Sequence, residues 1–191
     1  MGCLFCVAEG PQGSARIGVY MNLYEFLLQY RDSGRLPMHM PGHKGKAMLG
    51  FEPYDLTEID GADDLMAPDG IIAQSEAEAS RLFGARTFYS CGGSTLCIQV
   101  MLHLISLYAA QCGKKPIVLA GRNAHKAFVN ACALLDIGIE WLYPDDEQSY
   151  IACNITAQQI SERLAGQNGR ITAVYITSPD YLGNMQDIAA I

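Results

Sequence analysis

The sequence predicts an α/β fold with a mainly parallel sheet and flanking helices. Beyond residue 70, short apolar segments of strand length alternate with longer segments of helical periodicity, which is typical of βαβ units. Apolar residues make up 50% of the chain and charged residues 17%, so a packed core can form. A length of 191 residues suits one domain or part of a larger one.

Composition excludes several classes of function. The net charge is -7, and no basic run is longer than Lys114-Lys115, so we expect no nucleic-acid partner. The longest apolar stretch, residues 96–110, is shorter than the roughly 20 residues of a membrane span and is expected to be a buried helix. Seven cysteines without a regular framework, and an amino terminus unlike a secretory signal, indicate a cytoplasmic protein.

The chain divides into three predicted parts. Residues 1–20 form a leader that we expect to be poorly ordered, and residues 21–70 hold one helix and a long irregular segment. The segment 37–70 is dense in proline, glycine and acidic residues, which is typical of a loop that lines a site or an interface. Residues 71–191 carry the alternating strands and helices.

The expected helices begin and end at clear signals. Asn22 with Glu25, and Thr156 with Gln159, have the spacing of a capping box, in which side chain and backbone bond reciprocally at a helix start. Glycines follow several of the helical segments. The expected helices cover residues 23–33, 71–83, 94–112, 124–135 and 157–164.

Four strands are expected between these helices, at residues 87–91, 117–120, 139–143 and 171–177. Because helices separate them, the strands should be parallel, with right-handed crossovers. Ligands of such sheets bind at the carboxyl ends of the strands. The turns that follow the first two strands are therefore the first places to look for a site.

The most informative turn is Ser-Cys-Gly-Gly-Ser-Thr at residues 90–95. It joins a strand directly to a helix, where unpaired amides, the helix dipole and two hydroxyl groups would favour a phosphate. We expect Ser94 to cap this helix. The turn lacks the lysine of a nucleoside-triphosphate loop and the three glycines of a dinucleotide loop. An ordinary capped turn is the alternative interpretation.

A histidine follows the second strand, at what should be the same edge of the sheet. His125 could stack on a planar ring or titrate near neutral pH; alternatively, it is a helix cap or a surface residue. His39 and His43 are four residues apart, but Pro41-Gly42 breaks a helix between them, so we expect no metal site. The acidic residues within 55–69 miss the spacing of a calcium loop and are interpreted as a solvated, capped loop.

Five motifs in order carry a resemblance to a known family. They are Pro-Met-His-Met-Pro-Gly-His-Lys-Gly at 37–45, the acidic motif at 55–65, Phe-Gly-Ala through Gly-Ser-Thr at 83–95, Arg-Asn-Ala-His-Lys at 122–126 and Thr-Ser-Pro-Asp-Tyr-Leu-Gly at 177–183. From about residue 23 onward the chain resembles the Orn/Lys/Arg decarboxylases. These are enzymes that depend on pyridoxal 5'-phosphate (PLP) and have the aspartate-aminotransferase fold, PLP fold type I.

The resemblance implies a function and assigns residues to it. Gly93, Ser94 and Thr95 would hold the cofactor phosphate, and His125 would stack on the pyridine ring as a catalytic residue. The reaction would release carbon dioxide from arginine, lysine or ornithine and leave an amine of polyamine metabolism. Family members build active sites between subunits, so the full-length form should be at least a dimer, with the 37–45 and 55–65 motifs near the entrance and the dimer contact. The substrate is left open because Met66 and Asp180 depart from residues common in the family.

Two family motifs do not occur in residues 1–191: Asp-Glu-Ala-His-Gly, which holds the pyridine nitrogen, and Ser-x-His-Lys, whose lysine binds the cofactor. Lys126 is the least implausible substitute. We therefore expect residues 71–191 to form an incomplete PLP-binding large domain that is inactive alone. Without its neighbouring strands, the strand at 87–91 should expose unpaired backbone groups. The alternatives are another fold-type I enzyme, such as an aminotransferase, and a non-catalytic partner of a full-length decarboxylase.

Overall fold

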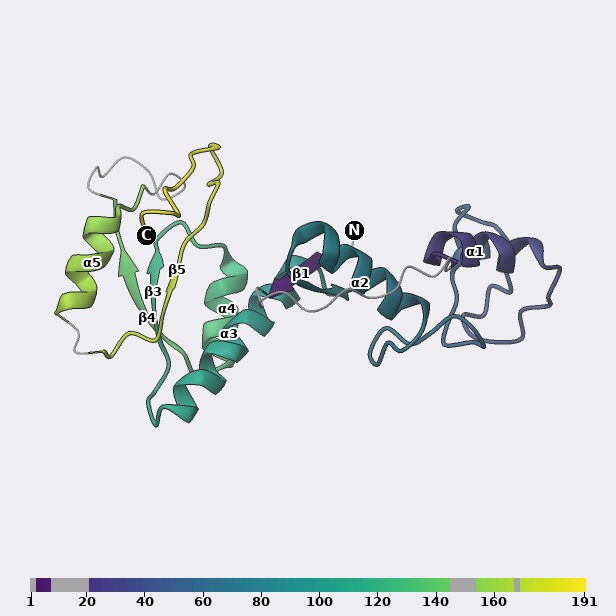
Figure 1. The fold of residues 1–191 in the computed structure, drawn as a ribbon, viewed down its shortest axis with the longest axis horizontal. Helices are drawn as coiled ribbons and strands as arrows, with labels where there is room; N and C mark the ends of the chain where they lie inside the picture. Colours follow the sequence, from purple (N-terminus) through teal and green to yellow (C-terminus); the bar gives the residue numbers. More distant parts are fainter. Residues whose placement is uncertain (1–2, 8–20, 145–153, 167–168) are drawn as a thin grey trace. The chain divides into compact units, whose positions relative to one another are not determined.

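A computed structural model of the chain describes residues 3–7, 21–144, 154–166 and 169–191 (Figure 1). The chain forms two compact units, Met1–Gly93 and Ser94–Ile191. Most of the predicted leader lies outside the described residues; the part that is described, Cys3–Val7, is a strand. The predicted division of the chain at residue 70 stays a prediction.

The first unit contains a two-stranded sheet, the helices α1, η1 and α2, and a long irregular segment. Strands β1 and β2 are antiparallel, with Cys3 opposite Ser90 and Val7 opposite Arg86. Helix α2 contacts β2, and α1 contacts the short helix η1. The elements of this unit are β1 (Cys3–Val7), α1 (Leu23–Asp32), η1 (Glu52–Tyr54), α2 (Ile71–Phe83) and β2 (Arg86–Ser90).

The second unit contains the predicted parallel sheet, with strand order β4-β3-β5. Helix α5 lies on one side of this sheet in Figure 1, and α3 and α4 lie on the other. Its elements are α3 (Gly93–Gln111), β3 (Ile117–Gly121), α4 (Lys126–Leu134), β4 (Gly138–Leu142), α5 (Ala157–Ala165) and β5 (Ala173–Tyr175).

The central strand β3 explains how two layers form around one sheet. Val118 and Ala120 are fully buried among Leu102 of α3 and Phe128 of α4. Leu119 points to the opposite face, because successive side chains of a strand alternate, and it packs in a second cluster with Leu142, Ile155 and Ile160. Strand β3 is therefore buried on both faces, which is typical of a parallel sheet covered by helices.

Most helix boundaries match their sequence signals. Both capping boxes are present, with Asn22 bonded to Glu25 and Thr156 bonded to Gln159. Gly84 has a φ of 63° and ends α2 in the left-handed conformation. Capping depends on only a few neighbouring residues, which is why these predictions succeed.

Other boundaries differ from expectation. Helix α3 begins at Gly93, so Ser94 lies inside its first turn and is not the cap. Helix α4 begins at Lys126 and ends before Gly138, because Asp136 takes the left-handed backbone conformation with a φ of 52°. Strand β5 is limited to Ala173–Tyr175, the part that pairs with β3.

Helix α3 is less buried than the sequence predicts. Among its residues, only Leu102 and Ala109 are fully buried. The helix is long and apolar enough to cross a membrane by length and composition, a test that core helices of soluble proteins also pass. Apolar side chains on its other side are exposed: Leu96, Val100, Leu104, Leu107 and Tyr108. Burial depends on residues distant in the chain, so helical periodicity alone does not predict it.

Candidate functional site

The turn between β2 and α3 has the open geometry that an anion site requires. Gly93 has a φ of 63°, which favours glycine, and a Cβ placed there would meet no atom within 4 Å. The backbone N–H of Gly92 donates to Ser90 Oγ at 3.1 Å, which holds the turn. Ser94 and Thr95 are exposed in the first turn of α3. Amides in a first helical turn have no partner within the helix, so this turn can receive a negatively charged group.

The local charge agrees with this interpretation. No acidic residue lies in the first turn of α3, so no carboxylate competes with an incoming anion there. The hydroxyl groups of Ser94 and Thr95 add two donors to the backbone amides. These residues fit the phosphate group that the resemblance assigns to them.

His125 is the N-cap of α4 in the structure. Its Nδ1 accepts a hydrogen bond from the backbone N–H of Ala127 at 3.1 Å, so in the neutral ring the proton lies on Nε2. The side chain is exposed, between the end of β3 and the start of α4. The alternative interpretation as a cap is thus confirmed, while stacking on a cofactor ring stays a prediction.

Asn123, in the same motif as His125, has a buried side chain that the sequence did not predict. Asn123 is only 6% exposed, and its Nδ2 has no hydrogen-bond partner among the described residues. A buried, unpaired donor is uncommon in native proteins. Next to it, the guanidinium of Arg122 lies over the ring of Trp141, 5.1 Å from its centroid. The family motif at 122–126 contains this asparagine, but the motif alone does not predict that its side chain is buried and unpaired.

The two candidate motifs follow strands of different sheets. The glycine turn follows β2 of the two-stranded sheet, whereas His125 follows β3 of the three-stranded sheet. The predicted shared sheet edge is therefore not present, because β1 and side chains of α2 occupy the edges of β2. A combined role for Gly93, Ser94, Thr95 and His125 stays a prediction.

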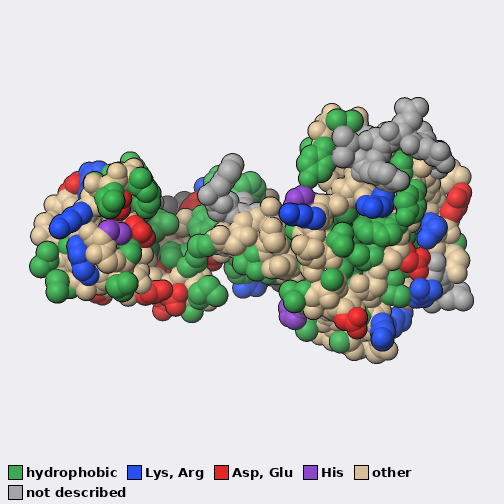
Figure 2. All heavy atoms as spheres, turned by 180° about the vertical axis from the view of Figure 1, so that it is seen from behind, with side chains coloured by type: hydrophobic (Ala, Val, Ile, Leu, Met, Phe, Trp, Pro, Cys, Tyr) green, Lys and Arg blue, Asp and Glu red, His purple; other side chains and the backbone are tan. Residues whose placement is uncertain are grey.

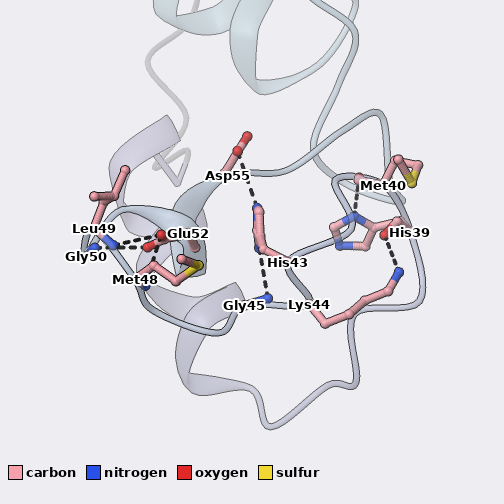
Figure 3. Close-up of polar contacts among 10 residues, drawn as sticks. All are labelled: His39, Met40, His43, Lys44, Gly45, Met48, Leu49, Gly50, Glu52 and Asp55. Atoms are coloured by element: carbon pink, nitrogen blue, oxygen red, sulfur yellow. Dashed lines mark hydrogen bonds and ion pairs between the residues drawn. The ribbon is translucent and has the colours of Figure 1, made fainter.

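In the irregular segment of the first unit, polar side chains bind nearby backbone (Figure 3). His39 Nδ1 donates to the Met40 carbonyl at 2.6 Å, and Lys44 Nζ donates to the His39 carbonyl at 2.8 Å. His43 Nδ1 accepts from the Gly45 amide at 3.0 Å. The two histidines therefore organise the loop. Within the described residues no group of three or more His, Cys, Asp or Glu side chains could hold a metal ion.

The buried carboxylate of Glu52 stabilises this segment. Glu52 is 6% exposed and accepts from the amides of Met48, Leu49 and Gly50 at 2.8–3.0 Å (Figure 3). The bond from Leu49 and those from the neighbouring amides lower the pKa of Glu52 to about 2, although burial opposes the shift.

The acidic motif contains an unpredicted helix cap. Asp63, with a φ of 68°, accepts from the amides of Gly70 and Ile72 at 2.8 and 2.9 Å, at the start of α2. Burial raises the pKa of Asp63, but hydrogen bonds from Asp69 and other amides outweigh it, so the pKa lies well below its usual range. The expectation of a solvated, capped loop thus holds for the capping role, whereas Asp63 itself is half-buried and caps a helix.

Comparisons with known proteins identify relatives over most of the chain. The sequence pattern described as Orn/Lys/Arg decarboxylase, major domain, matches residues 21–191. Arginine decarboxylase of Bacillus subtilis is 28% identical over 183 residues, and the uncharacterized protein YaaO of the same species is 28% identical over 180 residues. Each alignment covers 88% of this chain and 36% of the relative, so the chain spans about a third of their length.

Solved structures show the same fold. The constitutive lysine decarboxylase of E. coli matches with a TM-score of 0.58 at 19% identity, over 83% of this chain and 25% of that one. Lysine decarboxylase A of Pseudomonas aeruginosa matches with a TM-score of 0.54 at 20% identity, over 75% and 21% of the two chains. The predicted α/β class, a partial PLP fold type I domain, agrees with both.

Proposed function

Because the chain belongs to the Orn/Lys/Arg decarboxylase family, we propose that it is the amino-terminal part of a PLP-dependent decarboxylase of a basic amino acid. Arginine, lysine and ornithine are the candidate substrates, and the product is an amine of polyamine metabolism. The enzyme is cytoplasmic and at least dimeric in its full-length form. The observation that carries the proposal is the open turn at Gly93, Ser94 and Thr95, at the start of α3.

In this proposal the turn binds the cofactor phosphate. The amides of the first turn of α3 and the hydroxyls of Ser94 and Thr95 donate to phosphate oxygens. The exposed ring of His125 is held by its bond to the Ala127 amide, so its orientation is set before a cofactor binds. PLP, when bound, supplies an electron-withdrawing ring that accepts the electrons left by departing carbon dioxide.

Residues 1–191 alone are proposed to be inactive. The lysine and aspartate motifs of the family do not occur in them. Lys126 is the first residue of α4 and adjoins His125, but it is not in the family's lysine context. The chain would therefore bind the phosphate end of PLP weakly, without a covalent bond to a lysine.

The first experiment is a titration with PLP, followed through the fluorescence of Trp141, the single tryptophan of the chain. We expect saturable quenching that inorganic phosphate competes away. Replacing both hydroxyls, in Ser94→Ala with Thr95→Ala, should weaken binding by about tenfold or more, because each lost hydrogen bond contributes about 1 kcal/mol. Ser161→Ala removes an exposed hydroxyl of α5 and is the control.

Unchanged affinity in the double variant would contradict the phosphate site. Borohydride treatment tests the proposal that PLP forms no covalent bond with a lysine of this chain. A saturable adduct on Lys126 would contradict the proposed inactivity.

Two variants then separate the roles of His125. His125→Phe keeps a flat ring and loses the cap acceptor, whereas His125→Asn keeps an acceptor and loses the ring. If the ring stacks on the cofactor, PLP affinity survives better in His125→Phe, and thermal stability survives better in His125→Asn.

The exposed side of α3 favours a second candidate, a non-catalytic partner of a full-length decarboxylase. Helix α3 has apolar side chains on two opposite sides. The described residues bury one of these sides and leave the other exposed, where a partner could bind. The test is co-purification with a tagged full-length family member. Association that Leu104→Gln abolishes, without any PLP-dependent quenching of the chain alone, would favour this candidate over the first.

A further inference from the structure

Strand β2 has two backbone edges, and helix α2 closes one of them with side chains. The amide of Thr87 donates to Ser80 Oγ at 2.8 Å, and the amide of Tyr89 donates to Glu76 Oε1 at 2.7 Å. Glu76 is 8% exposed and Thr87 is 1% exposed, so these bonds are sheltered from water. Side chains of a helix thus take the place of a neighbouring strand along this edge.

The other edge of β2 faces β1. Backbone groups of successive strand residues point to alternate edges, so the amides of Arg86, Phe88 and Ser90 point away from the Ser80 and Glu76 side chains. Their partners across the sheet are Val7, Phe5 and Cys3. These three are consequently the hydrogen-bonded pairs of the ladder. Leu4 opposite Tyr89 and Cys6 opposite Thr87 are the non-hydrogen-bonded pairs.

We propose that β1 is an intramolecular strap that occupies the edge of β2 left open by α2, and so prevents this edge from pairing with another polypeptide strand. An open edge is a template for strand addition, and self-association follows when it is exposed. The strap also corrects the expectation that this strand carries unpaired backbone groups.

The strap lies outside residues 21–191, which match the decarboxylase family. The inference is therefore independent of the proposed function and needs no cofactor. It ties the amino terminus of the chain to the strand that leads into the glycine turn, because Cys3 is opposite Ser90. Release of the strap would make β2 available to a strand from another chain.

A matched pair of proline variants in the full chain tests the strap. Phe5→Pro removes an amide that points toward β2, whereas Leu4→Pro removes one that points away, where an edge strand tolerates proline. We expect the amides of Phe88 and Ser90 to exchange with solvent about five- to tenfold faster in Phe5→Pro. This variant should also self-associate on size-exclusion chromatography with light scattering, and Leu4→Pro should behave as the unaltered chain.

Engineered thiols test the register without disturbing the ladder. In Ser90→Cys the introduced cysteine is the backbone partner of native Cys3, at a Cα separation of about 5.5 Å that suits a disulfide. In Arg86→Cys, the control, the backbone partner of the introduced cysteine is Val7. Under mild oxidation, peptide mapping should find a bond from Cys3 to the new thiol in Ser90→Cys only. Equal cross-linking of Cys3 in both variants, or identical exchange and association of the two proline variants, would overturn the proposal.

Discussion

At the scale of single residues, Glu52 is a buried carboxylate whose charge is matched by backbone amides. Its oxygens accept from Met48, Leu49 and Gly50, and these bonds favour the ionised form, in which both oxygens are acceptors only. A carboxylate enclosed in this way binds its proton less readily when folded than when unfolded. The loop that follows α1 is therefore stabilised by charge as well as by packing.

This arrangement predicts a pH dependence. The pKa of Glu52 is lowered from 4.5 to about 2, so its stabilising contribution is complete above pH 4.5 and is lost as the pH falls toward 2. In NMR titrations the amide shifts of Leu49 and Gly50 should move with a midpoint near pH 2. In Glu52→Gln they should not titrate, and the loop should be less stable at pH 7.

The control is Glu78→Gln, which removes an exposed carboxylate paired with Arg81. Its loss should leave the Leu49 and Gly50 shifts unchanged. A midpoint near pH 4.5 for those amides in the unaltered chain would contradict the enclosed geometry of Glu52.

Three residues of the structure show which roles can be predicted from local sequence and which cannot. A helix cap was the alternative interpretation of His125, because its position after an apolar strand is a local signal, and the structure shows that cap. Asp63 and Asn123 could not be identified in this way. Asp63 caps a helix that begins several residues later through a left-handed turn, and the burial of Asn123 depends on elements that come together only in the fold.

At the scale of elements, the start of α5 depends on a capping box. Thr156 Oγ1 accepts from the Gln159 amide at 3.2 Å, and Gln159 Oε1 accepts from the Thr156 amide at 2.8 Å. Thr156→Ala should lower the free energy of unfolding by about 1 kcal/mol, as measured by urea denaturation. Gln158→Ala, which removes only the exposed contact with Glu162, should cost about 0.5 kcal/mol or less. Equal effects of the two variants would show that the box contributes nothing.

The elements also show which signals are local. Capping residues and glycine stops predicted helices α1, α2 and α5 well, because the information lies within one turn of each boundary. Strand β1 was not predicted, since its pairing with β2 joins segments about 80 residues apart in the chain. The sequence also predicts β2 as a strand of the parallel sheet, whereas it pairs with β1 in a separate sheet. This error has the same cause, because strand pairing depends on segments far apart in the chain.

At the scale of the whole molecule, many large apolar side chains of the described residues are exposed. Apolar side chains reach the surface in many places on the face shown in Figure 2. Five of them form a stripe on α3, at 39–60% exposure. Its spacing of three and four residues repeats that of the buried stripe at Ile98, Leu102, Ile105 and Ala109. One helix therefore carries two packing faces.

The two faces of α3 should respond differently to substitution. Leu104→Gln with Leu107→Gln changes side chains that are 46% and 47% exposed, so unfolding should change by about 0.5 kcal/mol or less per site. The same variant should bind less of the dye ANS, because the apolar stripe is interrupted. Leu102→Ala removes a fully buried side chain and should cost about 2–5 kcal/mol. Urea denaturation and ANS fluorescence on the three proteins measure both effects. Strong destabilisation by the outward pair would mean that the chain itself already covers this stripe, and the second candidate function would lose its support.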